Sequence, residues 1–211
     1  LKEMAKITGD GEAAWDTTAA NQDAGLRFFT CLDGTLAEKV RIKADGLLAC
    51  EGAIAMNGDT AAANQLDTYE EGTWTPGYAS NNGDMTSVVV NATFTTGTYV
   101  RIGRQVWVNG FIRTDSIGAL GSGYAVVTGL PYDSYNVALY NVYPTSVHTF
   151  FAFDSDGPED LQLPNNNNQL WLTKPGAAGA VTAYIDATDL STAANRNGIA
   201  FQLTYITDAA A

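Results

Sequence analysis

Histidine, cysteine and basic side chains are scarce in this sequence, and each shortage narrows what the protein can do. The 211 residues hold one histidine and two cysteines, and 11 Lys and Arg stand against 23 Asp and Glu, which gives a formal net charge of -12. That balance repels phosphate backbones and anionic membrane surfaces, so we expect no nucleic-acid binding. No window approaches the roughly 20 apolar residues of a membrane span, and no basic-then-apolar leader follows Leu1, so we expect no membrane insertion.

The shortage of histidine and cysteine also limits catalytic and metal sites. A Ser-His-Asp or Cys-His arrangement would need His148, which lies in the alternating segment SVHTFFAF, where we expect a structural strand residue. One histidine excludes a multi-histidine zinc site, and Cys31 and Cys50 do not lie at ligand spacing. We expect both cysteines to be small buried thiols, although a disulfide between them is an alternative. The sequence therefore predicts no enzyme and no cofactor.

Carboxylates are the one abundant class of reactive side chain, and they are densest in FDSDGPED, residues 153–160. Pairs of Asp or Glu at a fixed separation cleave glycosidic bonds, and Asp154, Asp156 and Asp160 offer oxygen ligands for Ca²⁺. The spacing does not fit an EF-hand loop, because Gly157 comes too early and no Glu occupies the twelfth position. We expect a solvated turn without a metal ion, with glycan cleavage and calcium binding as lesser alternatives.

The first 70 residues contain only short apolar segments between turn residues. Residues 26–32 and 39–44 are expected to form strands, and Asp-Gly pairs at 33–34 and 45–46 are strong tight-turn signals. Val40, Ile42 and Ala44 alternate with basic residues, which predicts one buried and one solvated face. Seventy such residues bury too little surface to stand alone. We therefore predict that residues 1–70 form an intertwined oligomeric β stalk; a small autonomous β domain is the alternative.

Residues 71–211 change to longer strand patterns with almost no helical periodicity. Loops rich in Asn, Asp, Gly and Pro separate them. Seven or eight turn-separated strands predict an all-β, antiparallel β-sandwich tip domain of jelly-roll-like type. The expected strands are SVVVNATF (87–94), GTYVRIGRQVWVNGFIRTD (97–115, two strands or one bent at Gly103), YAVVTGL (124–130), SVHTFFAFD (146–154), QLWLTKP (169–175), VTAYIDA (181–187) and GIAFQLTYIT (198–207).

Three segments carry a resemblance to a known family: EKVRIKADGLLACEGAI (38–54), NQLDTYEEGTWTP (64–76) and GTYVRIGRQVWVNGFI (97–112). Together they resemble the shaft, junction and first long hairpin of bacteriophage tail-fibre and related virion-fibre proteins. The similarity covers roughly residues 25–115, and the closing FQLTYIT is compatible with the last strand of that family. The resemblance implies a homotrimer, an N-terminal shaft, a C-terminal β tip and a role in host attachment. It does not imply a ligand.

The junction segment YEEGTWTP, residues 69–76, has a physical explanation of its own. Pro76 cannot donate to a β-ladder and favours extended geometry at the residue before it, which suits the start of an edge strand or the exit from a stalk. We expect Tyr69, Trp74 and Pro76 to lie at the seam between stalk and tip, with Trp74 as an apolar plug. Glu70 and Glu71 are expected to point outward or toward arginines of the tip rather than to act as a catalytic acid pair. Those arginines are Arg101, Arg104 and Arg113.

Aromatic residues in and beside the loops offer a binding surface. Aromatic faces with neighbouring Asn, Asp and Gln commonly hold sugar rings, and half-buried rim tyrosines are the alternative for each residue. The expected receptor-contacting residues are Tyr132, Tyr135, Tyr143 and Trp171, with Tyr124 and Tyr140 in the same loop regions.

These observations lead to one functional hypothesis and one alternative. The chain is expected to be a virion structural protein, a trimeric tail fibre whose distal β domain attaches to a host-surface receptor, with a glycan favoured over a protein. The alternative is a virion component without receptor function, such as a head fibre, a capsid decoration protein or a tail adaptor. Other virion proteins are expected partners in both cases. Such a protein assembles in the host cytoplasm and acts outside the cell, and a start at Leu1 suggests part of a longer polypeptide.

Overall fold

The computed structural model shows an all-β protein in which every paired strand is antiparallel. It describes residues 3–12, 14, 16–59, 61, 65–136, 145–155, 157–177 and 182–208. The chain divides into two compact units between Asp67 and Thr68, three residues before the division expected from composition. Across the described ranges, no helix has the length and apolar character needed to span a membrane.

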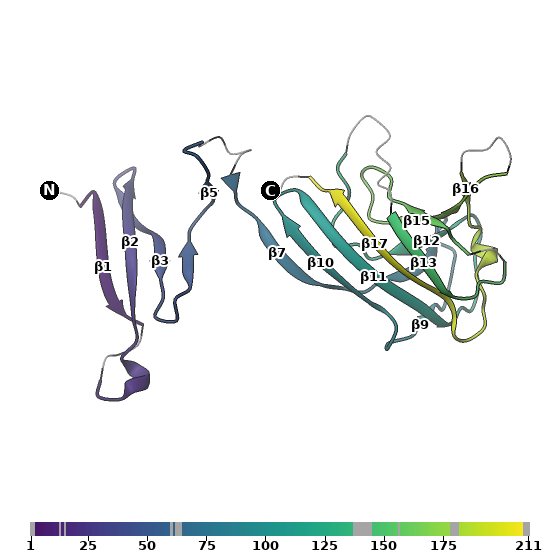
Figure 1. Ribbon diagram of the computed structural model, residues 1–211, viewed down its shortest axis with the longest axis horizontal. Coiled ribbons are helices and arrows are strands. Elements are labelled where there is room, and N and C mark those ends of the chain that lie inside the picture. The colour runs from purple at the N-terminus through teal and green to yellow at the C-terminus, as the bar shows by residue number, and fades with distance from the viewer. Residues whose placement is uncertain are drawn as a thin grey trace. The chain divides into compact units, whose positions relative to one another are not determined.

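The N-terminal unit is built around a four-stranded sheet in the order β1-β2-β3-β4, which Figure 1 shows as one layer. Its turns follow the sequence signals. Asp33 and Gly34 both adopt positive φ, of 50° and 80°, as a two-residue hairpin turn requires, and Gly46 does so at 86° in the next turn. The elements are β1 (Ala5–Gly11), a 3-10 turn η1 (Ala19–Asn21), β2 (Ala24–Leu32), β3 (Thr35–Ile42), β4 (Leu48–Cys50), and a separate pair, β5 (Ile54–Ala55) with β6 (Gln65–Leu66).

The two faces of this four-stranded sheet differ in chemistry. Residues that stand opposite one another in the register share a face of the sheet. On one face these residues carry apolar side chains. This apolar face consists of Ile7, Leu26, Phe28, Val40, Ile42, Leu48 and Cys50. The opposite face carries an ion-pair network in which Arg41 contacts Glu38 through two hydrogen bonds of 2.8 and 3.0 Å. Arg27 lies between Asp10 and Glu38 on that face, at 3.5 and 3.7 Å.

Within the described residues of the N-terminal unit, the apolar face is left largely open. Ile7 is 67% exposed, Leu48 57%, and Leu26 and Ile42 39% each. In the single chain Val40 is half-buried and Ile42 is exposed, and the burial of this face between copies of the chain stays a prediction. Cys31 and Cys50 are free thiols; Cys31 is half-buried and Cys50 is exposed, which corrects the expectation that both are buried.

The C-terminal unit contains two larger sheets (Figure 1). The first, called here the six-stranded sheet, has the order β13-β17-β11-β10-β7, with β9 also paired to β11, and the second, the five-stranded sheet, has the order β14-β15-β12-β8, with β16 paired to β15. The elements are β7 (Tyr69–Trp74), β8 (Gly77–Ser80), β9 (Val89–Val90), β10 (Thr96–Ile102), β11 (Gln105–Ser116), β12 (Ala125–Thr128), β13 (Thr145–Phe151), β14 (Asp160–Gln162), β15 (Leu170–Lys174), β16 (Ala183–Tyr184), a 3-10 turn η3 (Ala187–Asp189) and β17 (Arg196–Ile206).

A single apolar core lies between these two sheets, consistent with the predicted β-sandwich. Both sheets contribute fully buried side chains, which include Val106, Val108, Ile112, Ile199 and Leu203 from the first and Ala125, Val127, Leu161, Leu170 and Leu172 from the second. In β17 the inward residues alternate with exposed Gln202, Thr204 and Ile206, as the sequence pattern predicts.

One row of the core pairs two glycines with two aromatic rings. Gly97 and Gly110 stand opposite each other, flanked by Trp74 and Phe201 in the same register. A Cβ on Gly97 would collide with the indole of Trp74, and one on Gly110 would collide with the ring of Phe201. The glycines therefore provide the space that these two large rings occupy, an arrangement in which aromatic side chains cover bare backbone.

The longest predicted strands match the structure, and two shorter ones do not. The segment 97–115 forms the hairpin of β10 and β11, with Gly103 at φ 56° in the two-residue turn. The prediction for 87–94 holds only for Val89 and Val90. After them the side-chain oxygen of Asn91 accepts hydrogen bonds from the backbone N–H groups of Thr93 and Phe94 and closes a turn.

The prediction for 181–187 likewise holds only for Ala183 and Tyr184 among its described residues. Asp186 begins the 3-10 turn instead, and its backbone N–H donates to the carboxylate of Asp189 at 3.2 Å. This reciprocal cap satisfies backbone groups that a strand would have paired with a neighbour.

Candidate functional site

The sequence-predicted Trp171 lies in a three-membered aromatic cluster on the five-stranded sheet. Tyr124 stacks on Tyr184 with ring centroids 4.7 Å apart and planes at 23°. Trp171 meets both rings edge-on, at 5.4 Å from Tyr124 and 5.5 Å from Tyr184. Tyr184 is 42% exposed, and Trp171 and Tyr124 are half-buried. We call this Tyr124–Trp171–Tyr184 group the aromatic cluster; it offers solvent a partly exposed aromatic surface.

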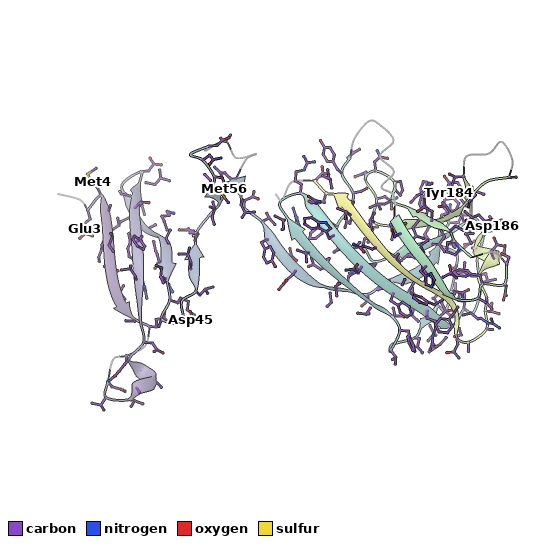
Figure 2. All side chains as sticks on the ribbon, in the orientation of Figure 1. Glu3, Met4, Asp45, Met56, Tyr184 and Asp186 are labelled. Carbon is purple, nitrogen blue, oxygen red and sulfur yellow. The ribbon has the colours of Figure 1, made fainter. Side chains whose placement is uncertain are left out.

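The aromatic cluster has polar neighbours fixed by the sheet register. Gln162 stands opposite Trp171 and shares its face. Asp186 forms a β-bridge with Tyr124, and Figure 2 places it next to Tyr184 at the same end of the unit. Aromatic surface beside amide and carboxylate groups matches the chemistry of a sugar, which has apolar C–H faces and hydroxyl edges.

A hydrogen-bonded loop network holds Tyr124 in place. The carboxylate of Asp84 accepts bonds from the hydroxyls of Ser80 and Ser122 and from the backbone N–H of Ser122. These bonds lower the pKa of Asp84 to about 2, and the Ser80 hydroxyl makes the largest contribution. The side-chain oxygen of Asn81 accepts from the backbone N–H of Tyr124 at 2.8 Å. Tyr124 therefore sits on an ordered turn rather than on a free loop.

The structure gives Tyr132 a different environment from that of Trp171. Its hydroxyl donates to Glu70, as does the hydroxyl of Tyr99, and the Arg101 guanidinium lies 4.6 Å from the Tyr132 ring centroid. The hydrogen bonds from Tyr132 and Tyr99 lower the pKa of Glu70, with Arg101 adding a smaller attraction. Tyr132 is half-buried. Its ring and hydroxyl are therefore occupied within the protein.

The adjacent carboxylates of Glu70 and Glu71 lie on opposite faces of β7, because successive strand residues alternate. Glu71 accepts a hydrogen bond of 3.1 Å from the hydroxyl of Tyr69, two residues earlier on its own face. This bond raises the pKa of Tyr69. The pair was expected to point outward or toward an arginine. Glu71 points outward, and Glu70 lies opposite Arg101 on the neighbouring strand.

Neither of the other two predicted receptor residues adds to the exposed aromatic surface that the structure describes. The ring of Tyr135 is stacked 4.1 Å from the Arg104 guanidinium and is half-buried. Tyr143 and Tyr140 lie outside the described residues. Of the three predicted residues that the structure describes, Trp171 alone lies in the aromatic cluster. Tyr184 was not predicted, because its short strand and its stacking on Tyr124 depend on long-range pairing.

The three residues expected at a seam all belong to the C-terminal unit. Trp74 is 8% exposed, and its indole N–H donates to the backbone oxygen of Asn109 at 3.2 Å. Pro76 falls in the break between β7 and β8, and β7 is an edge strand of its sheet, as a proline at this point predicts. Tyr69 is 64% exposed. The structure thus gives Trp74 a place in the core of the C-terminal unit itself.

The residues considered for catalysis and metal binding do not converge. His148 is exposed on β13, with its ring edge-on to Phe150 at 4.4 Å. The carboxylate of Asp160 accepts from the Thr145 hydroxyl at 3.0 Å, which links β13 to β14, and Asp156 lies outside the described residues. Among the residues that the structure describes, no group of three or more His, Cys, Asp or Glu is placed to hold a metal ion.

Comparisons of the chain with known proteins found no matching protein family, no matching curated protein and no matching solved structure.

Proposed function

We propose that this chain is a trimeric virion fibre protein, with an N-terminal β stalk that associates with identical copies and a jelly-roll-like C-terminal tip that binds a glycan on a host surface. The apolar face of the N-terminal sheet carries the proposal. Association and attachment are its two parts, and each rests on separate residues.

The association part follows from the cost of leaving the apolar face in water. Fully burying one Val, Leu, Ile or Phe side chain contributes about 1.5–3 kcal/mol relative to exposure. Ile7, Leu26, Ile42 and Leu48 are all more than a third exposed in the single chain. A contiguous exposed apolar face of this kind marks an interaction surface.

Identical copies of the chain are the best occupants of that face. The sheet has one apolar face and one ion-paired face, so copies can bring their apolar faces together and leave the Arg27, Glu38 and Arg41 network in water. A closed arrangement of like copies buries the same residues from each chain. The threefold state comes from the resemblance to virion fibres through residues 38–54, 64–76 and 97–112.

The attachment part is supported by the aromatic cluster. Tyr124, Trp171 and Tyr184 form a preformed, partly exposed surface on a rigid sheet, with Gln162 and Asp186 beside it. A site of this kind loses little conformational entropy when a ligand binds, because its side chains are already packed against one another.

The solution mass of the whole chain and of residues 68–211, measured by light scattering, tests the association. A trimer for the whole chain and a monomer for the shorter chain are expected. A monomeric whole chain would contradict the fibre proposal.

Attachment is tested with an array of surface oligosaccharides and with the Trp171→Ala variant. Binding that Trp171→Ala weakens at least tenfold is expected, since aromatic residues at the centre of a site carry much of its binding energy. Tyr69→Ala, which removes an exposed aromatic from the other sheet, is the control. A trimer that binds no glycan would favour the non-receptor alternative, a purely structural virion component.

A further inference from the structure

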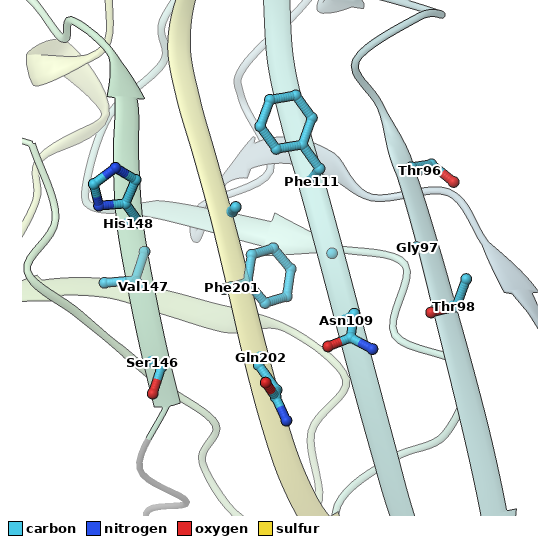
Figure 3. A pocket seen from close by; sticks show the side chains of 12 residues that line it. Thr96, Gly97, Thr98, Asn109, Phe111, Ser146, Val147, His148, Phe201 and Gln202 are labelled. Atoms are coloured by element: carbon cyan, nitrogen blue, oxygen red, sulfur yellow. The ribbon is translucent and has the colours of Figure 1, made fainter.

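A hollow lies on the outward face of the six-stranded sheet of the C-terminal unit. It is a groove of about 440 Å³ that crosses β13, β17, β11 and β10 (Figure 3). The floor of the groove is formed by a small side chain, because Ala200 lies between Phe111 and His148 in the register. The larger side chains at either end of this row form the rim of the groove.

A band of neutral polar side chains runs across the groove. Ser146, Gln202, Asn109 and Thr98 stand opposite one another on four successive strands, and Figure 3 shows them in one row. Gln202, Asn109, Ser146 and Thr98 are all exposed. Within the described residues, these four side chains make no hydrogen bond to another group.

Such a row has unused hydrogen-bonding capacity of both kinds. Each amide offers donors and an acceptor, and each hydroxyl offers one donor and two acceptor lone pairs. Phe111 adds an apolar ring directly beside the band, two residues along β11 from Asn109. Donors, acceptors and a ring in one open groove complement a ligand that carries several hydroxyl groups and apolar C–H faces.

The charge of the site selects among such ligands. Among the described residues that line the groove there is no Asp, Glu, Lys or Arg. The C-terminal unit as a whole carries twelve acidic and five basic side chains, so its field repels anions. An acidic polysaccharide is therefore disfavoured in this groove relative to an uncharged one.

We propose that this groove binds a neutral oligosaccharide, as a glycan site distinct from the aromatic cluster. The inference deepens the proposed function and rests on it, because both treat the C-terminal unit as a glycan-binding tip. The polar band would contact the hydroxyl edges of the sugar, and Phe111 one of its C–H faces.

An array of neutral hexose and N-acetylhexosamine oligosaccharides, printed beside uronate-containing ones, tests the inference on the whole chain. The tightest neutral ligand is then titrated against Asn109→Ala, Gln202→Ala and Gln105→Ala by calorimetry. Gln105 is the matched control, since it is an exposed amide on the same face of β11 as Asn109 and does not line the groove. Each groove variant should raise Kd about fivefold, in keeping with one lost hydrogen bond, and Gln105→Ala should leave Kd unchanged.

Three other outcomes would overturn the inference. If only Trp171→Ala weakens neutral glycans, the groove is not a glycan site, while the proposed attachment through the aromatic cluster stands. If Gln202→Ala lowers the solution mass, the face is covered by another copy of the chain. If no neutral oligosaccharide binds, the groove has a different role, and the association part of the proposed function is judged separately by solution mass.

Discussion

Trp74 lies edge-on against Phe201, with ring centroids 6.0 Å apart and ring planes at 60°. One ring comes from the edge strand β7 and the other from β17, and two glycines separate them in the sheet. This contact ties the segment just after the division between the two units into the core of the sandwich.

Trp74→Ala should destabilise the C-terminal unit by about 3–5 kcal/mol, because it leaves a cavity above Gly97 and removes the contact with Phe201. The urea midpoint of the C-terminal transition measures the loss. Trp107→Ala, which removes a half-buried indole from the same sheet, should cost much less. Equal losses in the two variants would show that Trp74 has no special place in the core.

Gly110→Ala should destabilise the protein by about 1–3 kcal/mol, because the added methyl group collides with the ring of Phe201. Phe201→Leu removes the ring atoms that would collide with the added methyl group, and it also destabilises the core because the contacts of the phenylalanine ring are lost. The double variant should therefore be more stable than the sum of the two single losses predicts, as a double-mutant cycle of unfolding free energies measures. Strict additivity would contradict the steric explanation.

The hairpin that carries Gly110 could be predicted from the sequence. The row of Trp74, Gly97, Gly110 and Phe201 could not. Alternation and Gly103 define β10 and β11 locally. Which residues face Gly110 depends on the pairing of β11 with β17, which is about 90 positions away in the chain. Trp171 was likewise predictable as a surface aromatic, whereas its contacts with Tyr124 and Tyr184 depend on long-range register.

Dependence on long-range pairing also explains why some predicted receptor residues lie outside the aromatic cluster. Tyr132 and Tyr135 do lie in a loop, as the composition indicates, but Arg101 and Arg104 occupy their rings. β14 was missed because Asp160, Leu161 and Gln162 follow a turn-rich segment, and only their pairing with β15 makes them a strand. Local patterns thus define strands and surfaces, and the partners of each side chain come from tertiary pairing.

Acid should destabilise the turn that supports the aromatic cluster through Asp84. The folded-state pKa of Asp84 is lowered to about 2 from 3.8, so its contribution is fully present above about pH 4 and is lost as the pH falls toward 2. Urea midpoints of wild type and Asp84→Asn across this window measure the effect, and the difference between them should shrink as the pH falls.

Asp208→Asn is the control for Asp84, because Asp208 is exposed and accepts no hydrogen bond from the described residues. Its difference from wild type should be small at every pH in the window. A constant gap between wild type and Asp84→Asn would show that the Asp84 carboxylate contributes nothing through its charge.

Glu70→Gln should lower the pKa of Tyr99, because the hydrogen bond to Glu70 is the main cause of its raised value. Glu71→Gln should lower the pKa of Tyr69 for the same reason, while leaving Tyr99 unchanged. NMR titration of labelled tyrosine separates the two effects. If both variants shift the same tyrosine, or neither shifts any, then the division of the two carboxylates between opposite faces of β7 is wrong.

Whether copies of this chain cover the apolar face of the N-terminal sheet is decided by the solution masses of Leu48→Asp and Ala49→Asp. These neighbours lie on opposite faces of β4, with Leu48 beside Ile42 on the apolar face and Ala49 beside Arg41 on the ion-paired face, and both are exposed in the single chain. Wild type and Ala49→Asp should scatter light as three chains of 22.3 kDa, and Leu48→Asp as one. A monomeric wild type, or a Leu48→Asp protein that keeps the wild-type mass, would show that this face does not hold the copies together.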